Sequence, residues 1–302
     1  MNLNTFVNAV FGKSPLQRKK LEPFLAAADA TFWERADRFA EQFDRYLRSV
    51  DLDVEYAVEA YLKLCKNMMT EQTKFLRSGV YSRANQKVAF AEVYSNDAEM
   101  RSYMVGLALS QFLWETHYAM YSFFLETVHR HAGRARRYLE IGPGHGLFLA
   151  GALNELGANE YEAVDISPVS IDVCRGFLPF LVTSQASPQF KLLDVLEIDT
   201  HESFDFVTMG EVIEHLDDPR PVLEKIRRLL SHGGVAFLST CANCPAIDHV
   251  YLFRNVCEIR ALLQSCGLQI HDERVLPVEK VTTEELELYR VCVNYAAVVR
   301  AS

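Results

Sequence analysis

The chain has 302 residues, of which 49% are hydrophobic and 24% are charged, and its formal net charge at pH 7 is −9. This length predicts about two domains, and the composition is typical of a globular protein that buries a substantial core. The acidic balance disfavours a nucleic-acid surface or an anionic-membrane surface, so we expect neither as a partner. Seven cysteines and the lack of an apolar leader at Met1 to Pro15 predict a cytoplasmic protein with free thiols.

The first 130 residues show helical rather than strand periodicity. Phe32, Phe39 and Phe43, for example, recur close to the helical period of about 3.6 residues. The expected helices cover residues 16–28, 31–50, 55–75, 97–114 and 117–128, and the short segment 88–94 is ambiguous. The longest apolar stretch, Tyr103 to Trp114, is too short for a membrane span and is better interpreted as a buried helix. We predict an all-α domain over residues 1–130 that forms a lid or substrate domain.

The pattern changes after the basic segment His129 to Arg137, which we interpret as a domain boundary. Over residues 131–302, short apolar runs alternate with helices, which is typical of a parallel α/β sheet. The expected strands cover residues 137–142, 160–165, 189–193, 204–210, 234–240, 268–276 and 290–299, and the expected helices between them cover 146–157, 169–182, 219–231 and 255–266. Because only Pro277 to Leu288 separates the last two strands, we expect the final strand to insert antiparallel beside its neighbour.

A glycine-rich turn lies between the first of these strands and the first helix. Gly142, Gly144 and Gly146 are spaced by two, and they lack the Cβ atoms that would keep a ligand away from the backbone and the helix N-terminus. Glycines in this pattern are a weak signal alone. Asp165 strengthens it, because a carboxylate at the end of the next strand can bind ribose hydroxyls. The arrangement predicts a ligand that contains a nucleoside.

Cys241 and Cys244 form a Cys-x-x-Cys pair, which is a possible zinc-binding motif. Cys257 and Cys266 lie nine residues apart on an expected helix and point to opposite faces. That placement does not suit one tetrahedral site, so we expect no metal.

The order of these signals resembles a class I S-adenosylmethionine-dependent methyltransferase over residues 136–300. Glu140-x-Gly142-x-Gly144-x-Gly146 is similar to the first motif of that family, and the run Glu211 to Pro219 is similar to its fourth-strand motif in enzymes that act on small molecules. The resemblance implies a Rossmann-like seven-stranded α/β sheet and S-adenosylmethionine as the cofactor. The cofactor-binding residues that it implies are Glu140, Gly142, Pro143, Gly144, Gly146, Asp165, Ile166, Asp194, Val195, Gly210, Glu211 and His215.

Candidate catalytic residues come from both halves of the chain. Asp248 and His249 follow the fifth expected strand, where carboxyl ends of strands border the ligand crevice, so His249 could act as a general base tuned by Asp248. His117 and Tyr118 lie on an expected helix and could reach the substrate, although their spacing also fits a core stripe. Aromatic faces can stabilise a sulfonium. The candidates for that role are Tyr94, Tyr103, Trp114, Tyr118 and Tyr121.

We therefore expect methyl transfer from S-adenosylmethionine to a small-molecule acceptor, by in-line displacement that yields S-adenosylhomocysteine. Two alternatives stay open: use of the aminocarboxypropyl group, with release of methylthioadenosine, and a non-catalytic protein that binds the nucleoside. An exposed helical face could support a homodimer. The sequence does not reveal the acceptor, because no motif is recognisable in the helical half.

Overall fold

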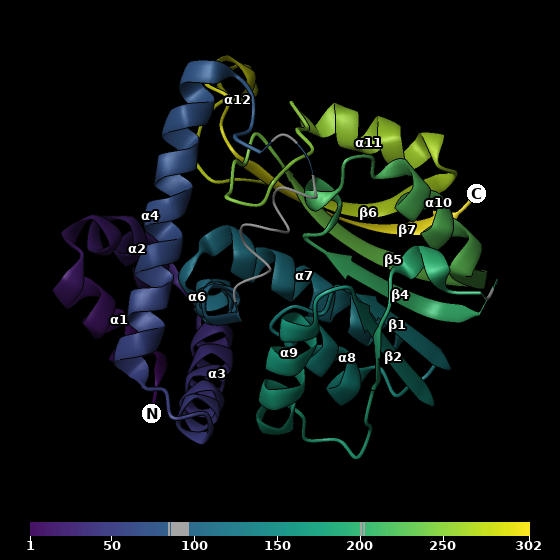
Figure 1. Cartoon of the computed structure of the whole chain (residues 1–302), viewed down its shortest axis with the longest axis horizontal. Coiled ribbons are helices and arrows are strands. Elements are labelled where there is room, and N and C mark those ends of the chain that lie inside the picture. Colours follow the sequence, from purple (N-terminus) through teal and green to yellow (C-terminus); the bar gives the residue numbers. More distant parts are fainter. Residues whose placement is uncertain (84, 86–96, 200, 202) are drawn as a thin grey trace.

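A computed structural model describes residues 1–83, 85, 97–199, 201 and 203–302. The N-terminal half consists of helices, which lie to the left of the sheet in Figure 1. These are α1 (Leu3–Lys13), α2 (Pro15–Ala27), α3 (Ala30–Ser49), α4 (Val54–Ser78), α6 (Asp97–Leu113) and α7 (Glu115–His131). All the expected helices are confirmed to within a few residues, whereas α1 was not predicted. Segment 88–94 and Tyr94 lie outside the described residues.

Side-chain caps explain where the helices of this half begin. The carboxylates of Asp29 and Asp53 accept hydrogen bonds from the backbone N–H groups of Phe32 and Tyr56, each at 2.8 Å. Each cap satisfies an N–H group that has no partner within its helix. The local sequence therefore fixes the starts of α3 and α4, which follow one another after a short turn.

The C-terminal half contains one seven-stranded sheet with helices on both faces (Figure 1). The strands are β1 (Arg137–Ile141), β2 (Glu160–Asp165), β3 (Gln189–Leu192), β4 (Phe204–Gly210), β5 (Leu230–Ala242), β6 (Leu268–Pro277) and β7 (Val293–Ala301). Their order is β3-β2-β1-β4-β5-β7-β6. Strand β7 pairs antiparallel with both β5 and β6, which confirms the expected α/β fold and the expected direction of the last strand.

The helices that accompany the sheet also match the expected ranges. They are α8 (Leu147–Glu155), α9 (Pro168–Leu181), α10 (Arg220–Leu229), α11 (Val256–Ser265) and α12 (Thr283–Leu288), together with short 3-10 turns at Val195–Glu197 and Ile213–His215. Helix α12 was not predicted. Strand β5 begins four residues earlier than expected, because Leu230 already pairs with Phe204 before an irregularity in the register.

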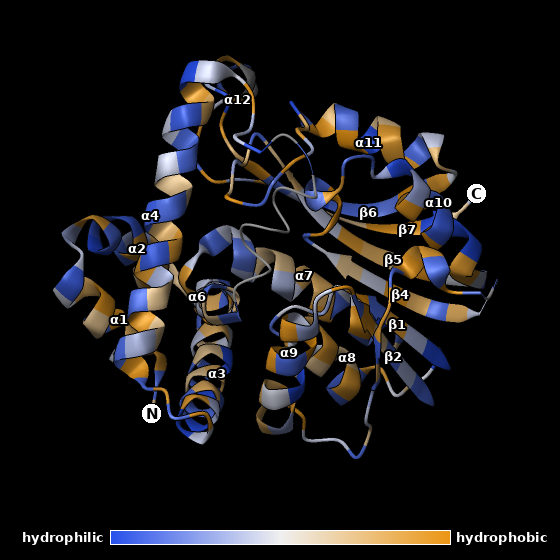
Figure 2. Ribbon diagram, in the orientation of Figure 1, coloured by the Kyte–Doolittle hydropathy of each residue, from blue (hydrophilic) through white to orange (hydrophobic). Residues whose placement is uncertain are grey.

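Alternate residues of each central strand enter two different cores. Tyr138, Phe206 and Phe237 join the core that contains α7, α8 and α9. Leu139 and Val207 join the core that contains α10 and α11. This alternation is the period-two pattern of a strand whose two faces are both covered. Figure 2 shows the result, since β5 and β7 are largely hydrophobic and the edge strand β6 is more hydrophilic.

The helical half and the sheet share one of these cores. On α3, Tyr46 stacks on Phe177 of α9, with ring centroids 4.8 Å apart. On α7, Phe124 meets Phe237 of β5 edge to face at 5.2 Å. Aromatic contacts of this kind add to the free energy gained by burying the rings. The division of the chain at residue 130 stays a prediction, because the shared core contains residues from both sides of it.

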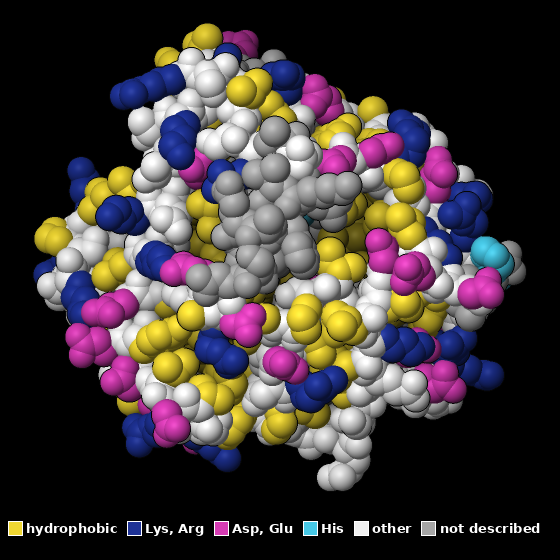
Figure 3. Space-filling model, in the orientation of Figure 1, with side chains coloured by type: hydrophobic (Ala, Val, Ile, Leu, Met, Phe, Trp, Pro, Cys, Tyr) yellow, Lys and Arg dark blue, Asp and Glu magenta, His cyan; other side chains and the backbone are white. Residues whose placement is uncertain are grey.

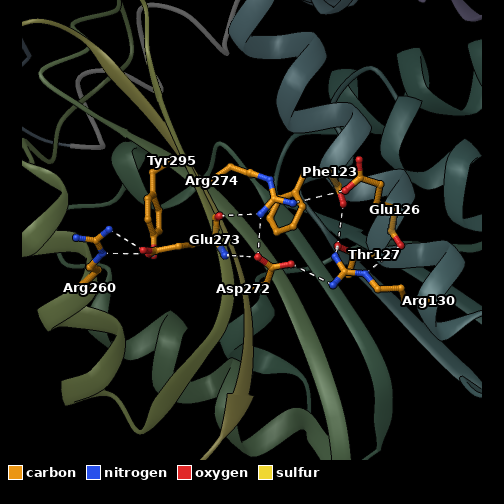
Figure 4. Close-up of polar contacts among 9 residues, drawn as sticks. All are labelled: Phe123, Glu126, Thr127, Arg130, Arg260, Asp272, Glu273, Arg274 and Tyr295. Atoms are coloured by element: carbon orange, nitrogen blue, oxygen red, sulfur yellow. Dashed lines mark hydrogen bonds and ion pairs between the residues drawn. The ribbon is translucent and has the colours of Figure 1, made fainter. Parts of the chain in front are cut away.

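A polar network also joins α7 to β6 (Figure 4). Arg130 pairs with Asp272 at 3.0 Å, and the Arg274 guanidinium lies over the Phe123 ring, 4.2 Å from its centroid. Exposed ion pairs contribute little to stability, but a cation over an aromatic face adds a directional contact. The network therefore helps to orient α7 against the outer strand.

Among the described residues, no helix is both long and apolar enough to cross a membrane.

Helices α4 and α6 approach closely at Gly106. A Cβ atom at this position would lie 2.9 Å from the carbonyl oxygen of Ala60. The opposing atom is backbone and cannot rotate away, so the helices would have to separate. We predict that Gly106→Ala lowers the free energy of unfolding by about 1–3 kcal/mol, measured by urea denaturation.

Gly12 provides the matched control for Gly106. It lies inside α1, and a Cβ atom there would have no neighbour within 4 Å among the described residues. Because alanine favours a helix more than glycine does, Gly12→Ala should leave stability unchanged or raise it slightly. Equal effects of the two substitutions would contradict the close packing of α4 on α6.

Candidate active site

A cavity of about 1050 Å³ lies beside the carboxyl ends of the parallel strands. Strand β1 lies between β2 and β4, so the chain leaves β1 and β4 in opposite directions across the sheet. Ligands of open α/β sheets bind at such a point. Helices α4, α6 and α7 contribute the opposite wall. The cavity therefore lies between the two halves of the chain.

The glycine turn forms one end of the cavity. Gly142, Gly144 and Gly146 have positive φ angles of 67°, 53° and 82°, which side chains other than glycine rarely adopt. A Cβ atom on Gly142 would lie 2.8 Å from Cγ2 of Val212. Helix α8 begins at Leu147, directly after the turn. At its glycines, which lack side chains, the backbone of the turn can contact a ligand directly. The adjacent N-terminus of α8 favours a negatively charged group on that ligand, so the turn suits a nucleoside cofactor that carries such a group.

Asp165 lies at the carboxyl end of β2 and lines the same cavity with Ile166. Its carboxylate accepts hydrogen bonds from the Ser167 backbone N–H at 2.8 Å and from the Ser170 hydroxyl at 2.6 Å. Burial raises the pKa of Asp165. These contacts fix the orientation of the side chain and keep it at the cavity wall, where a hydroxyl of a bound nucleoside could reach it.

Some predicted cofactor-binding residues do not line the cavity. Glu140 is buried beneath the turn, where it accepts a hydrogen bond from the Tyr138 hydroxyl at 2.5 Å. Asp194 is exposed and accepts from the Leu196 N–H at 2.9 Å. The cavity wall includes the predicted residues Gly142, Pro143, Gly144, Asp165, Ile166, Gly210, Glu211 and His215. It does not include Glu140, Gly146, Asp194 or Val195 among the described residues.

Two strained residues follow adjacent strands at the cavity. Glu211 comes directly after β4 with a φ of 54°, and Asn243 comes directly after β5 with a φ of 53°. A left-handed conformation is costly for residues other than glycine and often marks functional sites. The Asn243 side chain donates to the Arg254 carbonyl at 2.7 Å, which holds the loop that carries Asp248 and His249.

Acidic and imidazole side chains gather below these two residues. His215 Nδ1 lies 3.5 Å from Asp248 Oδ2, and the rings of His215 and His249 meet edge to face with centroids 4.9 Å apart. Glu214 accepts a hydrogen bond from the Thr240 hydroxyl at 2.8 Å. Ser239 donates to Glu211, also at 2.8 Å. We call Glu211, Glu214, His215, Asp248 and His249 the polar cluster.

Burial changes the protonation of the polar cluster. It raises the pKa of Glu214 to about 7, and burial together with Glu214 raises the pKa of Glu211 well above its usual range. Burial, with the nearby His215, lowers the pKa of His249 to about 4. At neutral pH, His249 is therefore a neutral imidazole with a lone pair available.

The helical half brings His117 to the cavity but not Tyr118. His117 lines the wall, contacts the Ser110 hydroxyl at 3.0 Å, and has a pKa lowered to about 3 by burial. Tyr118 packs on Phe32, with ring centroids 4.8 Å apart, because its direction on α7 points into the helical core. Of the aromatic candidates for the sulfonium, Tyr103 and Trp114 line the cavity and Tyr121 lies outside its wall.

The cysteines differ from the expectation of free thiols. Cys244 and Cys292 form a disulfide with Cα atoms 4.7 Å apart, and the other five cysteines are free. The prediction of seven free thiols was therefore wrong for this pair. It failed because sequence separation, 48 residues here, carries no information about which strand ends meet. Cys241 remains a thiol and lies 3.8 Å from His249 Nδ1.

Sequence reasoning also missed part of the wall. Glu214 was not predicted as a site residue, although it lies three positions after Glu211 and thus on the same face of a helical turn. The apolar wall had no recognisable motif. It includes Leu64, Met68, Met69 and Leu76 of α4 and Met100, Met104 and Leu107 of α6. Helical periodicity identifies such residues as buried, but it does not distinguish a core from a cavity.

Glu140 makes stability depend on pH. Burial raises its pKa from 4.5 to about 8 in the folded chain. Between these values the unfolded chain has released the proton and the folded chain keeps it, so stability falls as pH rises. Glu140→Gln removes this titration. We predict that the melting temperature of the variant relative to the parent rises between about pH 5 and pH 8, measured by calorimetry without ligand.

The exposed Glu34 serves as the control for this experiment. Glu34→Gln should change the melting temperature by a similar amount at both pH values. A Glu140→Gln difference that is independent of pH would show that this carboxyl is not held protonated in the fold.

Comparison with known proteins places these features in a family. Residues 114–273 match the family described as a methyltransferase domain. The ubiquinone biosynthesis O-methyltransferase of Xanthomonas oryzae pv. oryzae is 30% identical over 181 residues, which cover 53% of this chain and 74% of that protein. The protein of the same name from Xanthomonas euvesicatoria pv. vesicatoria has the same identity and coverage.

Solved structures share the fold. An O-methyltransferase family protein from Burkholderia thailandensis has a TM-score of 0.53 and 17% identity, over 83% of this chain and 73% of that chain. The N-methyltransferase NodS from Bradyrhizobium japonicum, in complex with S-adenosyl-L-homocysteine, has a TM-score of 0.51 and 17% identity, over 72% of this chain and 98% of that chain. The sheet, the glycine turn and the family match agree, and the chain belongs to the S-adenosylmethionine-dependent methyltransferases.

Proposed function

We propose that this methyltransferase transfers the methyl group to a hydroxyl oxygen of a largely apolar small molecule. The observation that carries this proposal is the composition of the cavity. One end has the glycine turn and Asp165, the floor has Glu211, His215, Asp248 and His249, and the opposite wall has the apolar residues of α4 and α6. A cavity of about 1050 Å³ is at the upper end of the usual range for ligand sites, so it has room for two ligands together.

The apolar wall supports an apolar acceptor. Methionines at positions 68, 69, 100 and 104 line it. Their flexible thioether side chains adapt to apolar ligands of irregular shape. The face in Figure 3 shows lysines and arginines interspersed with acidic residues rather than gathered in one basic patch, which agrees with a small-molecule acceptor.

The name of the relatives supports oxygen as the atom that is methylated. The Xanthomonas proteins are named O-methyltransferases, and their identity to this chain is 30%. A hydroxyl acceptor must lose its proton during the transfer, which requires polar groups near the methyl group. Four residues of the polar cluster, Glu211, His215, Asp248 and His249, line the cavity and can serve that purpose.

Each end of the cavity has a proposed role for this chain's own residues. Backbone N–H groups of the turn at Gly142 to Gly144 bind the cofactor, and Asp165 accepts hydrogen bonds from ribose hydroxyls. Glu140 and Gly146 act from behind the wall by shaping the turn. Asp194 and Val195 lie beyond the described wall and would hold the adenine if the bound cofactor reaches the turn after β3.

S-adenosylmethionine, when bound, supplies a methyl group on a sulfonium sulfur, which keeps the electron pair of the broken S–C bond. The residues of the polar cluster that line the cavity would hold the acceptor hydroxyl beside the bound cofactor, and such positioning favours transfer. His249 or Asp248 takes the hydroxyl proton, which leaves the products electrically balanced. His117 is a neutral hydrogen-bonding group on the opposite side of the cavity and can orient the acceptor.

Cofactor binding tests the proposed cofactor site at the glycine turn and Asp165. Calorimetric titration should show binding of S-adenosylmethionine and S-adenosylhomocysteine, and Asp165→Ala should weaken both by about tenfold or more, because hydrogen bonds to a charged group are lost. Asp172→Ala changes an exposed carboxylate on the neighbouring helix and should leave the affinity unchanged. An unchanged affinity in Asp165→Ala would remove Asp165 from the cofactor site.

Turnover tests the acceptor and the catalytic residues. With a panel of alkylated phenols and alcohols, mass spectrometry should detect S-adenosylhomocysteine and an O-methyl product. We expect His249→Ala and Asp248→Asn to lower kcat by about 10²–10⁴-fold without a matching loss of cofactor affinity. His271→Ala, on the exposed edge strand, should keep the parent rate. Methylthioadenosine in place of S-adenosylhomocysteine would instead support use of the aminocarboxypropyl group.

A further inference from the structure

The polar cluster contains two groups of side chains with the spacing of metal ligands. One ligand atom from each of His215, Asp248 and His249 lies within 4.8 Å of the others, and the same holds for Glu214, Cys241 and His249. Ligands bound at about 2.0–2.2 Å from a common ion lie about 3–4.4 Å from one another. The spacing within each group is therefore close to that of ligands around one ion, and His249 belongs to both groups.

Backbone carbonyls orient both imidazole rings. His249 Nδ1 lies 2.6 Å from the Cys244 carbonyl oxygen, and His215 Nδ1 lies 3.1 Å from the Asp248 carbonyl oxygen. A carbonyl accepts only from a protonated nitrogen, so each contact favours the tautomer with Nε2 as the free lone pair. Metal-binding histidines are fixed in this way by a second hydrogen bond to a carbonyl or carboxylate. Both rings are thus prepared to donate to an ion.

One carboxyl oxygen of the polar cluster has no hydrogen-bond partner among the described residues. Glu214 is fully buried, and its Oε1 atom has no hydrogen-bond partner among the described residues, whereas Oε2 accepts from Thr240. No described lysine or arginine forms an ion pair with Glu211 or Glu214. A buried carboxyl without a partner is costly. The unpartnered oxygen therefore indicates a missing electropositive neighbour.

We propose that Glu214, His215, Asp248 and His249 hold a divalent cation at the floor of the cavity. Two nitrogens and two carboxylate oxygens suit a first-row ion such as Mn²⁺ or Fe²⁺, since imidazole selects transition metals and carboxylate oxygen suits harder ions. Cys241 is the third member of the group that contains Glu214 and His249. Positions not taken by protein would face the cavity and remain open to water or an acceptor.

The role of this cation in catalysis rests on the proposed function, whereas its binding does not. An acceptor hydroxyl bound to the ion would lose its proton more readily, because the positive charge stabilises the oxyanion. His249 would then hold the ion rather than take the proton directly. The cation would also select acceptors with oxygen over apolar molecules without it.

Electron paramagnetic resonance tests the site without any turnover. The 302-residue chain is treated with a chelator, and Mn²⁺ is added without acceptor. Binding of one equivalent should reduce the six-line signal of free Mn²⁺. Glu214→Gln and His215→Gln should each weaken Mn²⁺ binding by about tenfold or more. Glu71→Gln, which changes another buried carboxyl paired with Lys74, should bind as the parent does. Circular dichroism checks that each variant is folded.

The results separate the two proposals. An unchanged Mn²⁺ signal at millimolar concentration, or equal affinity in parent and folded Glu214→Gln, would overturn the cation site. Release of S-adenosylhomocysteine by chelator-treated protein at the parent rate would leave methyl transfer intact and remove the ion from it. Mn²⁺ binding that depends on Glu214 and His215, without any O-methyl product, would keep the site and refute the proposed function.

Discussion

The pairing of β1 with both β2 and β4 is the constraint on which the site depends. Ile141 lies beside Val164 on one side and beside Met209 on the other, so three strands end at nearly the same level. The residues that follow are therefore neighbours in space although they are far apart in sequence. Gly142, Asp165 and Glu211 reach one cavity only because parallel strands expose their carboxyl ends at a single edge. Side-chain chemistry then decides what this edge can bind.

The helical half completes the cavity through packing rather than through a separate interface. Aromatic residues of α3 and α7 join the core beneath the sheet, and this shared core positions α6 across the carboxyl ends of the strands. Motion of α6 relative to α9 would have to break the packing of Met100 and Met104 on Val169 and Val173.

Much of the fold follows from local pattern, and less of the site does. Strands such as 160–165 and caps such as Asp53 are set by nearby residues, so the sequence predicts their ranges well. Asp194 was assigned from its motif, but the structure exposes it outside the described wall, because a motif gives the order of residues and not the direction of a side chain. Tyr118 illustrates the same limit. His117 and Tyr118 are adjacent on α7 and point in different directions, so one lines the cavity and the other packs in the core. The metal expectation considered cysteines alone, whereas the groups in the structure combine one strand end with the turn after β4.

The polar cluster is held together at a free-energy cost. Burying carboxyl groups and imidazoles together carries a free-energy penalty, and neutralisation of Glu211 and Glu214 relieves only part of it. Hydrogen bonds from Ser239 and Thr240 and strained backbone at Glu211 and Asn243 keep the groups together despite that penalty. A site meant only for packing would be more stable with apolar residues of the same volume. This cost agrees with the proposed role of these groups in ligand binding. A positively charged ligand would reduce the repulsion most directly, because it would pair with the ionised carboxylates.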